Sequence, residues 1–164
     1  MSKPFFASKE RQEKLVEKAR EWLGTPYRHC CKVKGRGADC ALLVVGVYEE
    51  LEIIDNYKSS YYPADWHING DTELFLEKMQ RFSEVLDVVP NQYSLEKVAE
   101  LSQFKIGDWL VASLNSKGLS NHSAIYIGDG KIIHSLNNIG VIEENIDQYI
   151  CKITCFYRVF EHGN

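Results

Sequence analysis

Hydrophobic residues at helical spacing predict two helices in the first third of the chain. The first begins at Ser8, which can cap it, and ends near Trp22. Its inner face carries Leu15 and Ala19. The second, residues 40–51, is hydrophobic on nearly all sides. Such a helix has no polar face to turn toward water, so we expect it at the centre of the domain.

The middle of the chain predicts a further helix after an irregular segment. Residues 57–70 are rich in aromatic side chains and show no regular spacing. Asp71 or Thr72 can then cap a third helix, and we also expect a short helix after Ser94. The inner face of the third helix is formed by Leu74, Phe75, Met79, Phe82 and Leu86.

Beyond residue 107 the pattern changes to short segments rich in Ile, Val and Tyr, separated by turn residues such as Gly128-Asp129-Gly130. These segments predict strands over residues 109–114, 122–127, 131–135, 140–143 and 149–160. Helices followed by strands are typical of an α+β domain. We therefore expect N-terminal helices packed on a C-terminal antiparallel β-sheet.

Composition narrows the classes of partner. The chain has 164 residues, the size of one domain, and a formal net charge of −4, which argues against nucleic acid as a partner. The longest hydrophobic run, residues 41–48, is too short to span a membrane. No hydrophobic stretch with a cleavage site follows the N-terminus, so we expect synthesis in the cytoplasm without a standard signal peptide.

Cys40 is the cysteine with the clearest chemical context. Five cysteines make a poor disulfide framework, so each is a buried residue, a metal ligand or a nucleophile. Cys40 follows Asp39, a capping residue, and begins the hydrophobic helix. Helix N–H groups and the helix dipole at that position favour a thiolate, which predicts a lowered pKa. The alternative is a small buried side chain without reactivity.

Two histidines lie on neighbouring predicted strands. His122 and His134 flank the Gly-Asp-Gly turn, and an antiparallel hairpin can bring their rings together at one end of the sheet. One imidazole could then act as a base while the second polar group holds its other nitrogen. The alternative for each is a hydrogen-bonded structural histidine.

Several motifs together resemble the NlpC/P60 family of cysteine peptidases. They are residues 19–29 (AREWLGTPYRH), 37–43 (GADCALL), 107–110 (GDWL), 122–128 (HSAIYIG) and 132–135 (IIHS). The resemblance implies a papain-like fold and a Cys-His-polar triad. Residues 61–66 (YYPADW) resemble the phage-associated branch, whose members lie in tail-assembly gene clusters.

Carried over residue by residue, the resemblance implies that Cys40 is the nucleophile, His122 the base and His134 the residue that orients His122. Tyr27 matches the tyrosine that faces the oxyanion. The chain also departs from the family pattern. The usual Ser-Gly after the nucleophile is Ala-Leu, and the usual Gly-Gly after the Tyr motif is replaced at residues 29–31 by His-Cys-Cys. Compared with compact members, the single domain, 1–164, carries an insertion at about 57–100 between the Cys and His motifs.

The remaining candidates are weaker. Cys30 and Cys31 are adjacent and lack a Cys-x-x-Cys spacing, so we expect no metal site, and their role stays open. Cys151 and Cys155 are predicted to face the core from one strand. The insertion offers a substrate-binding cluster, in which the alternative for the tryptophan is a plug that holds the loop on the domain. Its residues are Asp65, Trp66 and His67.

The resemblance implies a thiol hydrolase that cleaves amide bonds in peptidoglycan stem peptides, most often the γ-D-glutamyl–diaminopimelate bond, without a cofactor. One alternative is a structural or binding component of a phage tail tip with little hydrolytic activity. Another is a thiol acyltransferase or amidase with a different substrate. Because no signal peptide is seen, we expect the protein to reach the cell wall on a phage particle, in contact with tail proteins, or by lysis.

Overall fold

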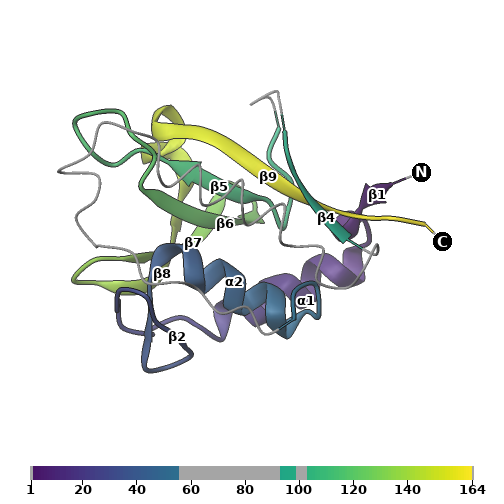
Figure 1. The fold of residues 1–164 in the computed structure, drawn as a ribbon, viewed down its shortest axis with the longest axis horizontal. Helices are drawn as coiled ribbons and strands as arrows, with labels where there is room; N and C mark the ends of the chain where they lie inside the picture. The colour runs from purple at the N-terminus through teal and green to yellow at the C-terminus, as the bar shows by residue number, and fades with distance from the viewer. Residues whose placement is uncertain (1, 56–92, 99–102, 164) are drawn as a thin grey trace.

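The computed structural model describes residues 2–55, 93–98 and 103–163. In this part of the chain, two α-helices lie beside one main antiparallel sheet (Figure 1). Both helices contact the central strand β6. The elements are β1 (Lys3–Pro4), η1 (Phe5–Ala7), α1 (Lys9–Arg20), β2 (Lys32–Val33), β3 (Gly37–Ala38), α2 (Cys40–Glu50), β4 (Tyr93–Lys97), β5 (Trp109–Ala112), β6 (His122–Gly128), β7 (Lys131–Leu136), β8 (Gly140–Asn145), η2 (Ile146–Gln148), η3 (Ile150–Lys152) and β9 (Ile153–Glu161). The predicted α+β class is confirmed.

Both predicted N-terminal helices form, and each begins at its predicted cap. Ser8 Oγ accepts a hydrogen bond of 3.3 Å from the N–H of Arg11 at the start of α1. Asp39 accepts one of 2.8 Å from the N–H of Leu42 at the start of α2. As predicted, α2 is buried on most sides, and Leu43 and Val44 are fully inaccessible to solvent.

The main sheet has the strand order β1-β9-β5-β6-β7-β8, and β4 pairs with β9 as well. All described pairs in it are antiparallel. The β6–β7 hairpin turns at residues 128–130, where Asp129 adopts a positive φ of 51° between two glycines that also have positive φ. At the edge of the sheet formed by β1, Lys3 pairs with Glu161 of β9, so the two ends of the chain lie together (Figure 1).

Three predicted elements differ from the structure or lie outside it. The predicted short helix after Ser94 is wrong: Leu95 is buried, and the segment pairs with β9 as strand β4. Residues 149–152 form 3-10 turns before β9, so Cys151 is exposed and does not face the core, whereas Cys155 is buried as predicted. The third helix, residues 72–86, falls outside the described residues.

The alternation of strand residues creates two hydrophobic clusters on the two faces of the sheet. The cluster on the helix side joins Leu43 of α2 to Ile125 and Ile133 of the β6–β7 hairpin. The cluster on the other side contains Ala124 and Ile132, the residues that precede those two along their strands. Neighbouring residues of one strand therefore serve different clusters, an arrangement on which the candidate site also depends.

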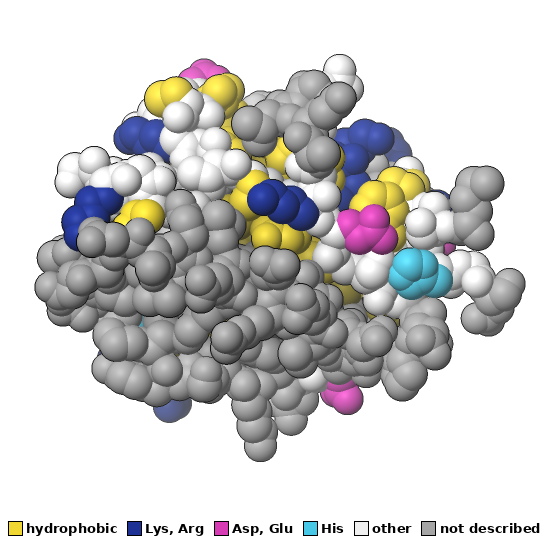
Figure 2. Space-filling view, turned by 45° about the horizontal axis from the view of Figure 1, so that its top comes forward, with side chains coloured by type: hydrophobic (Ala, Val, Ile, Leu, Met, Phe, Trp, Pro, Cys, Tyr) yellow, Lys and Arg dark blue, Asp and Glu magenta, His cyan; other side chains and the backbone are white. Residues whose placement is uncertain are grey.

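Neither described helix combines the length and the hydrophobicity needed to cross a bilayer. Figure 2 shows one face of the molecule, on which Lys and Arg side chains lie in several separate places. Acidic and hydrophobic side chains lie between them. The described charges on this face are thus mixed.

Gly46 tests the contact between α2 and Trp22, which follows the end of α1. A Cβ atom at this position would lie 2.5 Å from the ring of Trp22, whose Nε1 donates to Glu50. We expect Gly46→Ala to lower the free energy of unfolding by about 1–3 kcal/mol. This loss would occur even though alanine favours helices by about 1 kcal/mol. Urea denaturation measures the change, and a second variant that adds Trp22→Phe should recover part of the loss. An unchanged or higher stability of Gly46→Ala would contradict the packing described here.

Candidate active site

Two strand serines hold the segment that carries Cys40. Ser123 Oγ donates a hydrogen bond of 2.8 Å to the carbonyl of Cys40, and Ser135 Oγ donates one of 2.7 Å to the carbonyl of Ala38. Both hydroxyls are buried. The two bonds attach the residues on either side of Asp39 to β6 and β7, so the start of α2 is fixed against the hairpin.

Each of these serines follows a histidine directly, and the histidines meet each other. His122 Nε2 and His134 Nδ1 are joined by a hydrogen bond of 2.9 Å. Their ring centroids lie 5.0 Å apart in an edge-to-face arrangement. Consecutive side chains of a strand point in opposite directions. In both β6 and β7 the serine therefore points toward α2, and the histidine before it points toward the other histidine. The predicted meeting of the two imidazoles is confirmed.

The sulfur of Cys40 lies beside the start of β6, where the backbone N–H groups of Ser123 and Ala41 act on the thiol. Ser123 is the residue next to His122. The fold thus brings Cys40 to the start of β6, which bears His122, the first member of the histidine pair.

The prediction of a lowered thiol pKa is wrong. Burial of the side chain, reinforced by the negative charge of Asp39, raises the pKa of Cys40 to about 12. The hydrogen bonds from Ser123 and Ala41 oppose this rise without reversing it. The helix start does supply donors, but removal from water outweighs them. The resting group is therefore a neutral thiol at pH 7.

His122 is likewise neutral in the resting site. Its burial, with the repulsion of a charge on His134, lowers the pKa of His122 to about 3. A neutral imidazole has one nitrogen that can accept a proton. A neutral thiol beside a neutral imidazole suits general-base catalysis, in which the proton moves as the sulfur attacks.

Tyr27 is held near Cys40 by backbone pairing on two sides. Its chain neighbour Pro26 accepts from the N–H of Ala38, and Thr25 accepts from the N–H of Val141 in β8. Burial, together with the charges of Cys40, Asp39 and Cys30, raises the pKa of the Tyr27 phenol. The hydroxyl therefore stays protonated and can donate to a developing negative charge.

Within the described ranges, one group has the composition of a metal site: His29, Cys30 and Asp39, whose ligand atoms lie within 4.8 Å of one another. The carboxylate of Asp39 has a structural task in this group. One of its oxygens accepts from the N–H of Leu42 and the other from the N–H of Cys30, each at 2.8 Å. The bond to Cys30 holds the turn at residues 28–31, where Cys30 has a positive φ of 55°, the conformation in which glycine is favoured. Asp39 therefore links this turn to the start of α2.

The candidate substrate cluster Asp65, Trp66 and His67 lies outside the described residues. Sequence reasoning missed four side chains of the site: Ser123, Ser135, Glu144 and Tyr149. The repeated His-Ser dipeptide at residues 122–123 and 134–135 was a signal for the serines, because a polar residue on the helix side of a buried strand needs a partner. No comparable sequence signal marks Glu144, because its contact with His134 depends on the register between β7 and β8.

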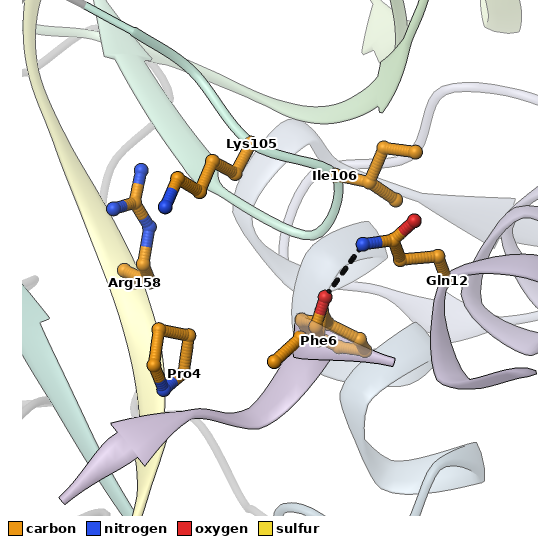
Figure 3. A pocket seen from close by; sticks show the side chains of 7 residues that line it. Pro4, Phe6, Gln12, Lys105, Ile106 and Arg158 are labelled. Atoms are coloured by element: carbon orange, nitrogen blue, oxygen red, sulfur yellow. Dashed lines mark hydrogen bonds between the residues drawn. The ribbon is translucent and has the colours of Figure 1, made fainter. Parts of the chain in front are cut away.

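A pocket of about 320 Å³ lies among β1, α1 and β9 (Figure 3). Pro4, Phe6 and Ile106 line its hydrophobic part, and Gln12 donates to the Phe6 carbonyl at 2.9 Å. Its arginine, Arg158, is already paired with Asp108 at 2.8 Å. None of its lining residues belongs to the histidine pair or to the Cys40 segment.

The model of the NlpC/P60 family matches residues 24–158 of the chain. This range contains Cys40, both histidines, Tyr27 and the two serines. No curated protein sequence matches the chain significantly.

Solved structures with this fold include NlpC1 from Trichomonas vaginalis, with a TM-score of 0.60 and 17% identity over 96% of this chain. An NLP/P60-family protein similar to a lipoprotein, from Staphylococcus aureus, also has a TM-score of 0.60, with 17% identity over 94% of this chain. This chain covers 47% and 43% of those chains, so it spans less than half of their length. A third structure is the NlpC/p60 domain of the peptidoglycan hydrolase SagA, with a TM-score of 0.52 and 20% identity. The match covers 90% of this chain and 97% of that domain. At these identities the likeness concerns the fold.

The serine contacts can be tested through stability. We expect Ser123→Ala and Ser135→Ala each to lower the free energy of unfolding by about 0.5–1.5 kcal/mol, because each removes one buried hydrogen bond to the Cys40 segment. Urea denaturation measures the loss. Ser94→Ala is the matched control, since the Ser94 hydroxyl donates an exposed hydrogen bond to Glu96. Equal stability of all three variants would show that the two buried bonds do not hold the segment.

The state of Cys40 can be tested by alkylation. With a pKa of about 12, Cys40 should react with iodoacetamide at pH 7 more slowly than the exposed Cys151, and its rate should rise steadily from pH 7 to pH 9. Mass spectrometry of tryptic peptides gives both rates from one sample. Labelling of Cys40 that is faster than that of Cys151 and independent of pH would instead indicate a resting thiolate.

Proposed function

Because the chain belongs to the NlpC/P60 family of cysteine peptidases, we propose that it hydrolyses amide bonds in peptidoglycan stem peptides with Cys40 as the nucleophile. The observation that carries the proposal is the docking of Cys40, at the start of α2, onto β6, the strand that bears His122, whose ring is bonded to His134 of β7. A thiol, a base and a residue that orients the base then share one site. The substrate class follows from the family and from the description of SagA as a peptidoglycan hydrolase.

In the first half of the reaction, the Cys40 sulfur bonds to the carbonyl carbon while its proton passes to His122. The carbonyl oxygen becomes an oxyanion, which accepts hydrogen bonds from the Tyr27 hydroxyl and from the Cys40 N–H. That N–H belongs to the first turn of α2, where backbone donors have no partner within the helix. The carbon–nitrogen bond then breaks, and the leaving amine takes the proton from His122.

In the second half, water attacks the thioester carbon while His122 accepts its proton. The carbon–sulfur bond breaks, the thiol of Cys40 is restored by that proton, and the product leaves as a carboxylic acid that gives its own proton to water. Both halves need one acceptor nitrogen on His122, and neither requires a metal. His134 holds the other nitrogen of His122 throughout.

The proposed bond is the γ-D-glutamyl–diaminopimelate amide, following the resemblance. Delivery to the cell wall on a phage particle or by lysis stays a prediction, because the motif that suggests it, residues 61–66, lies outside the described residues. A gene neighbourhood with tail genes on both sides would support the phage route.

Digestion of purified muropeptides tests the proposed activity. Mass spectrometry should show that the wild-type protein splits the stem peptide, and Cys40→Ala should lower the rate at least about 1,000-fold, because no other group replaces the nucleophile. Cys151→Ser is the matched control, since that thiol is exposed and outside the site. Cleavage by Cys40→Ala at the wild-type rate would exclude the mechanism. A wild-type protein that binds but does not cleave would favour a structural role at a tail tip.

A further inference from the structure

Glu144 closes a chain of hydrogen bonds that begins at His122. Its Oε2 atom lies 2.7 Å from His134 Nε2, and the hydroxyl of Tyr149 donates to the same oxygen at 2.7 Å. Its Oε1 atom accepts a bond of 3.3 Å from the Gln148 amide. His122 therefore holds one ring nitrogen of His134, and Glu144 holds the other.

The carboxylate determines the direction of every bond in this chain. An ionised carboxylate only accepts, so His134 Nε2 must carry the proton that points at Glu144. The Nδ1 atom of a neutral His134 is then an acceptor, and His122 Nε2 must donate to it. The remaining nitrogen of His122, Nδ1, consequently keeps a free lone pair.

We infer that Glu144 is a positioning residue that sets the tautomers of both histidines, so that His122 Nδ1 is ready to accept the proton of Cys40. This inference rests on the proposed function, in which His122 is the base. Glu144 acts through His134 and touches neither the thiol nor the scissile bond. The triad is thereby extended by a carboxylate from β8 and by Tyr149, which fixes that carboxylate.

Glu144 is ionised under ordinary conditions. Partial burial acts to raise its pKa, but hydrogen bonds from Tyr149 and His134 outweigh burial and lower the pKa below its usual value. The Tyr149 ring also stands edge-on to His134, with centroids 5.1 Å apart. Tyr149 thus holds both members of the Glu144–His134 pair.

The arrangement gives the reaction a defined response to acid. Among the described residues, the titratable groups in contact with His134 are His122, Glu144 and Tyr149, and Lys152 lies over the Tyr149 ring. Burial lowers the pKa of His134, while the bond to Glu144 and its charge oppose that change. A proton gained by His134 at Nδ1 would reverse the bond to His122 and place the His122 proton on Nδ1. His122 could then no longer accept the proton of Cys40.

This response predicts the sign of a shift. Glu144→Gln removes the negative charge that supports a proton on His134, so the pKa of His134 falls further. The acidic limb of the kcat/KM profile should therefore move to lower pH. At neutral pH, kcat should fall roughly 10- to 100-fold, the range found for outer partners that orient a ligating histidine, with KM nearly unchanged.

Muropeptide kinetics between pH 4 and pH 9 form the first part of the experiment. Glu143→Gln is the matched control, because this neighbour on the same strand pairs with Arg20 at 2.8 Å instead of His134. Tyr149→Phe keeps the ring and the carboxylate, and it should lose less activity than Glu144→Gln. A Glu144→Gln enzyme with the kcat and the acidic limb of the wild type would overturn the inference.

Ring-nitrogen NMR of the ¹⁵N-histidine-labelled resting protein forms the second part, and it needs no substrate. At pH 7 the wild-type protein should carry the protons of both His122 and His134 on Nε2, and the midpoint of the His134 titration should fall in Glu144→Gln. A His134 proton on Nδ1 in the wild type, or an unchanged midpoint, would overturn the inference. If the expected tautomers appear in a protein that does not cleave muropeptides, the proposed substrate fails and the role of Glu144 in setting the tautomers stands.

Discussion

The hydrogen bonds from two strand serines to the Cys40 segment are the contacts on which the site depends. Ser123 and Ser135 each follow a histidine, and strand geometry sends consecutive side chains to opposite faces of the sheet. In the hairpin, the two serines therefore bind the Cys40 segment, and the residue before each serine supplies one imidazole of the histidine pair. A shift of the hairpin register by one residue would exchange these tasks and dismantle the site. The arrangement of the candidate site and the packing of the core thus depend on the same pairing of β6 with β7.

Burial and hydrogen-bond direction explain the electrostatics better than net charge does. Both Cys40 and His122 are neutral at rest, because removal from water costs a charged form more than the nearby donors return. The ionised group of the hydrogen-bonded chain is Glu144, placed at its more exposed end. The negative charge of Glu144 therefore lies near solvent, and it acts on the buried His122 through the hydrogen bonds of His134. With both groups neutral at rest, the thiol becomes reactive only when a bound substrate supplies the electrophile.

The sequence could predict the elements but not all of their contacts. Helical spacing and Ser8 predicted α1, and the turn at residues 128–130 predicted the hairpin that joins the histidines. The thiol pKa was predicted with the wrong sign, because local helix position is visible in a sequence and depth of burial is not. Glu144 was missed for a related reason, since its place beside His134 is set by the β7–β8 register.

The pairing of β1 with β9 has a practical meaning for any larger assembly that contains this domain. Because Lys3 lies opposite Glu161, the chain enters and leaves at one corner of the sheet, and three strands, β9, β5 and β6, separate the edge strand β1 from β7, which carries His134. A neighbouring domain, an affinity tag or a surface anchor joined at either end would extend from this same corner. Such an addition would therefore lie at the edge of the sheet that is away from the histidine pair.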